Sequence, residues 1–342
     1  MLRRIRLLAA ALLLGFTAVP VQAQQPAGAQ APTPSELAFG VISTESTTSL
    51  RTQWEPFFAD MSKAIGVPVK GFYATDYAGI IEGMRFNKVQ LAWYGNASAI
   101  QAVDRADGEV FMQKVFGDGT LGYNSVLIVP KDSPIKSLDD LLKSPGKYTF
   151  GNGDPNSTSG FLIPSYYVWA KNNIDIRKHF TRTVSGSHEI NLLAVANKQV
   201  DVATCNTEDM TKIQRNHPDK VAAVREIWRS PIIPADPIVW RKDLDPALKA
   251  KIAKFFTDYG AAPGTLGDEQ KKILVGINVQ RFVASTDAQL LPVRQVALFK
   301  DRTKIEQDEA LNADEKAKKI AEIDAKLREL DKKVAELSAK KG

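Results

Sequence analysis

Short apolar segments alternate with amphipathic ones along most of this chain. Each apolar segment is followed by a polar turn, and most of these turns lead into residues with helical periodicity. Strands that alternate with helices in this way predict crossover connections and an open α/β sheet. The strand patterns lie at residues 36–42, 67–73, 89–94, 123–130, 148–150, 181–184 and 200–204.

The polar turns after these strands are the expected places for a ligand, because ligands of open α/β sheets lie beyond the carboxyl ends of strands. Such turns occur at Thr44, Asp76 and Gly95. We therefore expect polar side chains from several turns to meet at one edge of the sheet.

The turn at residues 151–160 has the most distinctive composition. It consists of Gly-Asn-Gly-Asp-Pro-Asn-Ser-Thr-Ser-Gly, and no Lys or Arg lies between Tyr148 and Ala170. Because an apolar segment follows, the pattern predicts a helix start at which hydroxyls and free backbone N–H groups converge. Such a point binds anions with neutral donors, although an ordinary capped helix has the same pattern. The hydroxyls are those of Ser157, Thr158 and Ser159.

Two segments, residues 123–129 and 228–240, look like crossings between two lobes. They bracket a continuous inner lobe, which predicts an interrupted outer lobe and hinge closure about a central cleft. The expected division is residues 36–125 and 234–300 for lobe 1, 126–233 for lobe 2, and 301–342 for a C-terminal helical extension.

The C-terminal extension carries a narrow apolar stripe among many charged residues. The apolar positions recur with alternating spacings of three and four, which is typical of one helix face. Asn312 and Glu315 have the spacing of a capping box at the helix start. The stripe could pack on the protein's own body or pair with a second copy, and we expect a modest dimer contact. Its members are Ile320, Ile323, Leu327, Leu330, Val334 and Leu337.

The N-terminus has the three-part pattern of a secretory signal peptide. Arg3, Arg4 and Arg6 precede an apolar run at residues 7–16, and a small-residue cleavage site ends at Ala23. The run is too short for a membrane span. We expect a signal peptide at residues 1–23, a disordered linker at residues 24–35, and a soluble periplasmic protein.

Cysteine content and charge exclude several classes of protein. Cys205 is the only cysteine, so an internal disulfide and a lipid-anchored cysteine at the mature N-terminus are both excluded. The formal net charge is +6, and removal of the three signal-peptide arginines leaves about +3, too weak a charge for a nucleic-acid binder. The histidines, at positions 179, 188 and 217, lack the spacing of metal ligands.

Several longer motifs make the chain similar to a known family. It resembles the phosphonate-binding protein of phosphonate ABC importers (PhnD-type) from about Leu37 into the C-terminal helix. The motifs that carry this resemblance are Ile42 to Ser46, Asp76 to Ile81, Met84 to Lys88, Ala92 to Asn96, Gly151 to Phe161, Ala194 to Thr204 and Pro234 to Lys242.

The resemblance implies a two-lobed periplasmic binding protein of type II, with two crossing hinge strands and a C-terminal charged helix. The implied ligands are alkylphosphonates, above all 2-aminoethylphosphonate, delivered to a membrane permease that a separate ATPase drives; no cofactor is implied. The implied phosphonate-binding residues are Tyr123, Ser157, Thr158, Ser159 and His188. The implied residues around the ligand's amine are Tyr77, Glu208 and Asp236.

Charge considerations favour the same kind of ligand. Glu208 and Asp236 would repel a bare anion, so a ligand beside them should carry a cation. Phosphate or phosphite would leave two buried carboxylates unpaired, which is costly. Binding of phosphate, phosphite or phosphate esters stays open as an alternative.

Each site residue also has an ordinary structural explanation. Tyr123 could be a core tyrosine, and His188 could have a capping role at the surface. Glu208 could be a first-turn helix acid favoured by the helix dipole, and Asp236 could fix a turn. A rival of another class is a secreted hydrolase with a triad of Ser157 or Ser159, His188 and Glu208. The chain lacks the Gly-x-Ser-x-Gly elbow of many such enzymes, so we expect a binding protein and no enzyme.

Overall fold

The computed structural model describes residues 35–339, with side chains up to residue 336. The predicted signal peptide lies outside the described residues, as does nearly all of the predicted linker. Within the described part of the chain, no helix is both long and apolar enough to cross a membrane.

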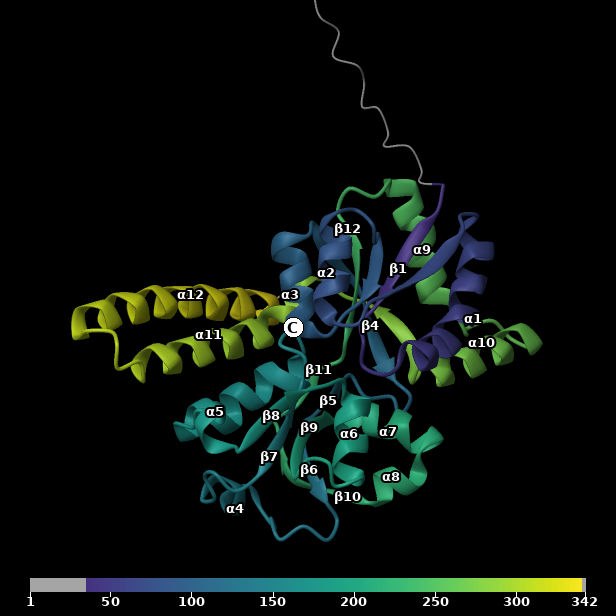
Figure 1. Cartoon of the computed structure of the whole chain (residues 1–342). Helices are drawn as coiled ribbons and strands as arrows, with labels where there is room; N and C mark the ends of the chain where they lie inside the picture. Colours follow the sequence, from purple (N-terminus) through teal and green to yellow (C-terminus); the bar gives the residue numbers. More distant parts are fainter. Residues whose placement is uncertain (1–34, 340–342) are drawn as a thin grey trace, which may run out of the picture. The chain divides into compact units, whose positions relative to one another are not determined.

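The first of two large sheets has six strands in the order β13-β4-β12-β3-β1-β2. Figure 1 labels β1, β4 and β12 of this sheet. β1 is parallel to β2 and β3, whereas β12 and β13 return antiparallel from a later part of the chain. The strands are β1 (Leu37–Val41), β2 (Val69–Tyr73), β3 (Leu91–Trp93), β4 (Gly108–Phe116), β12 (Pro237–Arg241) and β13 (Val279–Ala284). The helices of this part are α1 (Thr47–Ile65), α2 (Tyr77–Arg85), α3 (Asn96–Arg105), α9 (Pro246–Asp258) and α10 (Thr265–Gly276).

Aromatic side chains fill the core between this sheet and its helices. Trp54 and Phe58 of α1 contact Phe39 of β1, and Trp54 stacks on Trp93 at a ring separation of 5.5 Å. These rings are fully buried, and each contributes on the order of 2 kcal/mol of burial free energy. The stack fixes Trp93 at the end of β3, next to the functional site.

The second large sheet has five strands in the order β10-β6-β9-β7-β8. β7 is parallel to β8 and β9, and β6 is antiparallel to its neighbours β9 and β10. The strands are β6 (Ser125–Pro130), β7 (Thr149–Asn152), β8 (Arg182–Ser185), β9 (Val202–Asn206) and β10 (Val224–Arg229). The helices of this part are α4 (Leu138–Leu142), α5 (Ile176–His179), α6 (His188–Ala196), α7 (Thr207–Asn216) and α8 (Pro218–Ala222).

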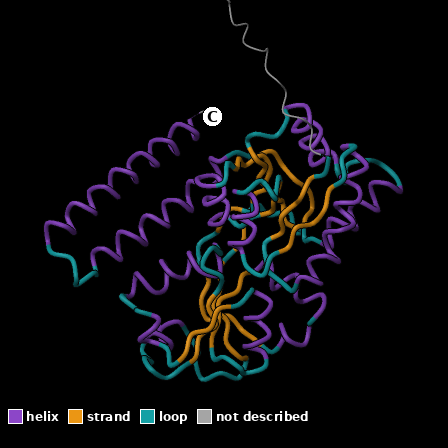
Figure 2. Tube along the Cα trace, turned by 45° about the horizontal axis from the view of Figure 1, so that its top comes forward, coloured by secondary structure: helices purple, strands orange, loops and turns teal. Residues whose placement is uncertain are grey.

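Two short strands connect the sheets. β5 (Gly122–Tyr123) leads from the first sheet into the second, and β11 (Ile233–Pro234) leads back. They pair antiparallel with each other, so the chain crosses twice at one place. The mixed α/β class and the two crossing strands of the sequence prediction are confirmed; Figure 2 shows the strands of both sheets covered by helices.

The helix expected after the serine-rich turn is not a regular α-helix. It consists of two π-helical turns, Thr158–Leu162 and Ser165–Trp169, followed by a 3-10 turn, Ala170–Asn172. Pro164 explains the irregularity, because it has no N–H to donate to the carbonyls one turn before it. The hydroxyl of Ser125 binds the Ser159 carbonyl instead, at 2.6 Å.

The C-terminal segment forms two helices that run side by side (Figures 1 and 2), α11 (Leu291–Glu306) and α12 (Ala313–Ala339). A 3-10 turn, Asp287–Leu290, precedes α11. The predicted capping box is confirmed, since Asn312 and Glu315 exchange hydrogen bonds. Arg302 of α11 binds Asp324 of α12 at 2.8 Å. The stripe packs at least partly on the chain's own helix, with Ile323 and Leu327 each only 8% exposed.

Candidate functional site

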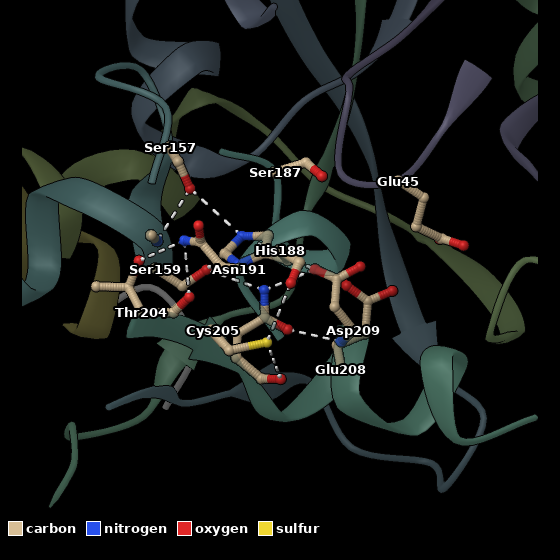
Figure 3. A network of polar contacts seen from close by, with 12 residues as sticks. Glu45, Ser157, Ser159, Ser187, His188, Asn191, Thr204, Cys205, Glu208 and Asp209 are labelled. Carbon is tan, nitrogen blue, oxygen red and sulfur yellow. Dashed lines mark hydrogen bonds and ion pairs between the residues drawn. The ribbon is translucent and has the colours of Figure 1, made fainter. Parts of the chain in front are cut away.

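A small cavity brings together side chains from both sheets. All eight residues predicted for the ligand site line it, although they come from six separate segments of the chain. Figure 3 shows part of this cluster, with Ser157, His188 and Glu208 among the labelled side chains. The cavity is lined by Ile42, Thr44, Tyr77, Gly95, Tyr123, Ser157, Thr158, Ser159, His188, Asn206, Glu208, Asp209 and Asp236.

Close backbone packing holds the serine-rich turn in place. The Ser157 hydroxyl caps the first π-helical turn by accepting a hydrogen bond from the Gly160 N–H at 3.0 Å. Gly153 donates to the Gly160 carbonyl at 3.0 Å, and a Cβ at Gly153 would lie 2.5 Å from the Gly160 backbone. Glycine is therefore required at position 153, which accounts for part of the unusual composition of this turn.

The hydroxyls of this turn, together with His188, form what we call the hydroxyl end of the cavity. Thr158 Oγ1 accepts a hydrogen bond from the Ala97 N–H at the start of α3, at 2.8 Å. Ser159 Oγ accepts one from the Asn206 side chain at 3.1 Å. The hydroxyl end thus consists of neutral groups that follow β7 and β8 of the second sheet, and the bond from Ala97 ties it to α3.

His188 is the first residue of α6 and is 4% exposed. Its Nε2 lies 3.5 Å from Ser157 Oγ and 3.4 Å from Ser159 Oγ (Figure 3). Burial lowers the pKa of His188, so the imidazole is neutral at pH 7. Its Nδ1 has no hydrogen-bond partner among the described residues.

The two tyrosines of the predicted site both lie near Asp236. The Tyr123 hydroxyl donates to Asp236 Oδ1 at 3.1 Å. Burial raises the pKa of Tyr77, and the charges of Asp209, Asp236 and Asp154 add to the rise. Tyr123 therefore contacts Asp236 directly, and Tyr77 lies close enough to the same carboxylate for its charge to act on it.

Glu208 and Asp236 form what we call the carboxylate end. Asp236 Oδ2 accepts a hydrogen bond from Trp93 Nε1 at 3.0 Å, in addition to the Tyr123 contact on Oδ1. Burial raises the pKa of Asp236 to about 7, and the charge of Glu208 adds to the rise. This carboxyl group is thus satisfied by neutral donors and holds its proton unusually tightly.

Glu208 has a cationic partner that the sequence analysis did not identify. Its Oε1 lies 3.0 Å from the Nζ of Lys114, and both side chains are almost completely buried. The expectation that an amine-free ligand would leave two unpaired carboxylates is therefore wrong. Lys114 pairs with Glu208, and hydrogen bonds from Trp93 and Tyr123 satisfy Asp236.

A second buried ion-pair chain runs from the first sheet to the hydroxyl end. Lys212 of α7 contacts Glu45 of the β1–α1 loop and lies 3.3 Å from Asp209. Asp209 accepts a hydrogen bond from Asn206 at 2.7 Å, and Asn206 in turn donates to Ser159. Burial alone would lower the pKa of Lys212, but the carboxylates around it, Glu45 first, raise it.

Comparisons with known proteins place this geometry in a family. Residues 39–290 match the family described as the periplasmic phosphonate substrate-binding protein of ABC transporters. The chain is 56% identical over 291 residues to the phosphonates-binding periplasmic protein of Escherichia coli K12, covering 85% of this chain and 84% of that protein.

A solved structure agrees with this match. The binding protein component of an ABC phosphonate transporter from Pseudomonas aeruginosa superposes with a TM-score of 0.85 at 53% identity, covering 89% of this chain and 99% of that one. A more distant relative, the phosphate-import protein PhnD of Mycolicibacterium smegmatis, is 27% identical over 65% of this chain and 71% of that protein. The chain belongs to the periplasmic phosphonate-binding protein family. It is the phosphonate-binding component of an ABC transporter.

The sequence did not predict the residues of this phosphonate-binding protein that form ion pairs and hydrogen bonds with the predicted ligand residues. Three of them are buried charged residues, Lys114, Asp209 and Lys212. The pattern of apolar and polar positions around them does not predict that they are buried. Asn206 carries a weak signal, because it ends a strand and caps α7. Thr44 was noted as a strand-end turn only, yet its hydroxyl is buried in the cavity wall without a partner among the described residues.

Proposed function

We propose that this protein binds 2-aminoethylphosphonate and related alkylphosphonates and delivers them to the permease of its transporter, which a separate ATPase drives. The observation that carries the proposal is one cavity with neutral donors at one end and carboxylates at the other. A zwitterion with an anionic head and a cationic tail matches both ends. No cofactor is needed for such binding.

The phosphonate group is assigned to the hydroxyl end. Its three oxygens would accept hydrogen bonds from Ser157, Thr158, Ser159 and His188, each contributing about 1.5–3 kcal/mol.

The ligand's ammonium group is assigned to the carboxylate end, beside Glu208 and Asp236. The hydrogen bond from Tyr123 to Asp236 supports placing Tyr123 at this end and not at the phosphonate. Tyr77 is assigned to this end as well, as the resemblance implies, because the charge of Asp236 acts on it.

Calorimetry of the mature protein tests the proposal. We expect 2-aminoethylphosphonate to bind more tightly than n-propylphosphonate, which has the same shape but a methyl group in place of the ammonium. Absence of binding heat with any phosphonate would overturn the proposal. Tighter binding of phosphate or phosphite would favour the alternative, which the name of the M. smegmatis relative raises.

We infer that the protein does not catalyse a reaction on its ligand. In a serine-hydrolase triad, the two histidine nitrogens face the serine and the acid separately. Here Asp209 lies 3.8 Å from the same Nε2 that faces Ser157 and Ser159, and Glu208 is paired with Lys114. Phosphorus NMR of the ligand during long incubation should show no new product.

Three further assignments belong to the proposal. We infer two lobes that close about the β5–β11 crossing, export by a signal peptide cleaved after Ala23 without lipid attachment, and a modest homodimer through α12. Scattering with and without ligand tests the closure, and the mass of the exported protein tests the cleavage. Sedimentation of a variant truncated before α12 tests the dimer.

A further inference from the structure

Thr44 follows β1 and brings a hydroxyl group from the first sheet to the wall of the cavity. The residue is 3% exposed, and its Oγ1 is buried without a hydrogen-bond partner among the described residues. Buried hydroxyls in proteins nearly always have a partner, because it is costly to leave one without. A hydroxyl in this condition at the wall of a ligand site indicates that the ligand supplies the partner.

The backbone around Thr44 fixes the position of this hydroxyl. The Thr44 N–H donates to the Ile42 carbonyl at 2.9 Å, which closes a tight turn after β1. The Thr44 carbonyl accepts the N–H of Glu189 at 3.2 Å, and the Ser46 N–H donates to the Glu189 carboxylate at 2.7 Å. Thr44 is thus held against the first turn of α6 by bonds that do not involve its own hydroxyl.

The first turn of α6 also carries His188 of the hydroxyl end, directly before Glu189. Of the residues that line the cavity, Thr44 and His188 are the two with a buried side-chain atom that has no partner in the described part of the chain. At the carboxylate end, by contrast, Glu208 and Asp236 both have partners. The unmet hydrogen-bonding capacity of the cavity therefore lies beside the start of α6, at the hydroxyl end.

The geometry of a phosphonate group fits this arrangement. The hydroxyl oxygens of Ser157, Thr158 and Ser159 each accept a hydrogen bond from a protein N–H group, so their O–H groups can donate to a ligand. These three hydroxyls all follow β7 of the second sheet. The three oxygens of a phosphonate diverge from the phosphorus, so donors from one sheet alone leave part of the group without partners.

We propose that Thr44 is a further phosphonate-binding residue, whose hydroxyl donates to the ligand from the first sheet. The inference rests on the proposed placement of the phosphonate group at the hydroxyl end and deepens it. With Thr44 included, both sheets bind the anionic head of the ligand. The contact is made only when the β1–α1 loop lies against α6, so binding of the phosphonate favours the closed arrangement of the two sheets.

The valine and serine variants of Thr44 test the proposal by calorimetry. Thr44→Val removes the hydroxyl and keeps the shape of the side chain. It should raise the Kd of 2-aminoethylphosphonate and of n-propylphosphonate equally, by about tenfold to 100-fold, because a hydrogen bond to a charged group is lost. Thr44→Ser keeps the hydroxyl and should leave both Kd values within about threefold of the wild type.

The direction of the Thr44→Val effect separates a ligand contact from a structural role. If the hydroxyl does not contact the ligand, valine only removes an unpartnered polar group from the cavity wall, and binding stays the same or becomes tighter. Either result overturns the proposal. A loss confined to 2-aminoethylphosphonate would place the hydroxyl at the ammonium, and equal losses in Thr44→Val and Thr44→Ser would assign the effect to packing; both outcomes also overturn it.

Thr149→Val is the matched control for stability. The Thr149 hydroxyl donates to the Asp201 carboxylate at 2.7 Å and accepts the Asp201 N–H at 3.0 Å, and Thr149 does not line the cavity. In urea unfolding without ligand, Thr149→Val should lower the free energy of unfolding, and it should leave both Kd values unchanged. Thr44→Val should do the reverse. A comparable loss of ligand-free stability in Thr44→Val would show that its hydroxyl has a structural partner, and the proposal would be wrong.

Ser159→Ala, measured beside Thr44→Val, separates the possible failures. If the wild type binds neither phosphonate, the proposed function fails. If the wild type binds but Ser159→Ala changes neither Kd, the placement of the phosphonate fails, and the role of Thr44 fails with it. If Ser159→Ala weakens the binding of both ligands and Thr44→Val does not, only the assignment of Thr44 is wrong.

Discussion

The hydroxyl end and the carboxylate end of the cavity are assembled in different ways. Three consecutive residues, Ser157 to Ser159, supply most of the hydroxyl end, and backbone geometry of one turn aims them at one point. The carboxylate end consists of Glu208 and Asp236, which come from separate segments of the chain. Its net charge also depends on Lys114, which lies in a third segment and pairs with Glu208.

The difference has an energetic basis. A buried neutral hydroxyl needs only one hydrogen-bond partner, which can come from its own turn, as for Ser157, or from another segment, as for Thr158 and Ser159. Buried charges need opposite charges within a few ångströms, and those must come from whichever segments the fold brings near. The hydroxyl end should therefore bind the phosphonate group of any alkylphosphonate. The carboxylate end should select the ligands that also carry an ammonium group.

Asp236→Asn should give the largest effect. Loss of this carboxylate should weaken binding of 2-aminoethylphosphonate by about 100-fold or more, because the ligand's buried ammonium loses a counter-charge. Binding of n-propylphosphonate should change much less. Calorimetry with both ligands measures the two losses, and equal losses would show that the ends do not act separately.

Ser159→Ala should have the opposite signature. Removal of one donor to the phosphonate should weaken both ligands by about tenfold to 100-fold and leave their ratio unchanged. Ser165→Ala is the matched control, because Ser165 lies in the next π-helical turn and does not line the cavity. A change in the ratio would mean that Ser159 also senses the ligand's tail.

The same contrast explains what the sequence could predict. The hydroxyl end was predictable because its residues are contiguous and their capping pattern is local. The strands β1 to β3 and the crossings were predictable for a similar reason, since each is a short apolar run bounded by polar turns. All eight residues predicted for the site line one cavity, and this common location follows from the order of strand ends in an open sheet.

The missing parts depend on long-range pairing. The apolar pattern did not identify β4, in which Lys114 follows Gln113 and interrupts the alternation expected of a strand. Lys114 is buried there because Glu208, far along the chain, meets it. The π-helical turns were missed for a different reason: the effect of Pro164 on the helix depends on the Ser125 hydroxyl that replaces its missing donor.

The pH dependence of stability provides a ligand-free test of the carboxylate end. Folding raises the pKa of Asp236 from 3.8 to about 7, so the folded protein keeps a proton that the unfolded chain releases. This contribution to stability is fully present below pH 3.8 and is lost as the pH rises to about 7. The loss is at most about 1.4 kcal/mol for each pH unit.

Urea unfolding at a series of pH values measures this contribution. Asp236→Asn should remove it, so the stability difference between variant and wild type should shift in favour of the variant between pH 4 and 7. Other titrating groups affect both proteins equally and cancel in the difference. A stability difference that stays constant between pH 4 and 7 would show that Asp236 is ionised over this whole range. Its pKa would then resemble that of an exposed aspartate.

The smallest effect is expected from a contact that belongs to neither end. The Glu189 N–H donates to the Thr44 carbonyl at 3.2 Å, and its carboxylate accepts a hydrogen bond from the Ser46 N–H at 2.7 Å. These bonds join α6 to the β1–α1 loop, so in the proposed hinge closure they would stabilise the closed form. Glu189→Ala should therefore weaken the binding of both ligands equally, by about three- to tenfold, because the closed form is less populated.

Glu226→Ala is the control, because Glu226 pairs with Arg229 on its own strand β10. A loss confined to 2-aminoethylphosphonate would place Glu189 in the electrostatics of the carboxylate end, and the separation of closure from recognition would no longer hold.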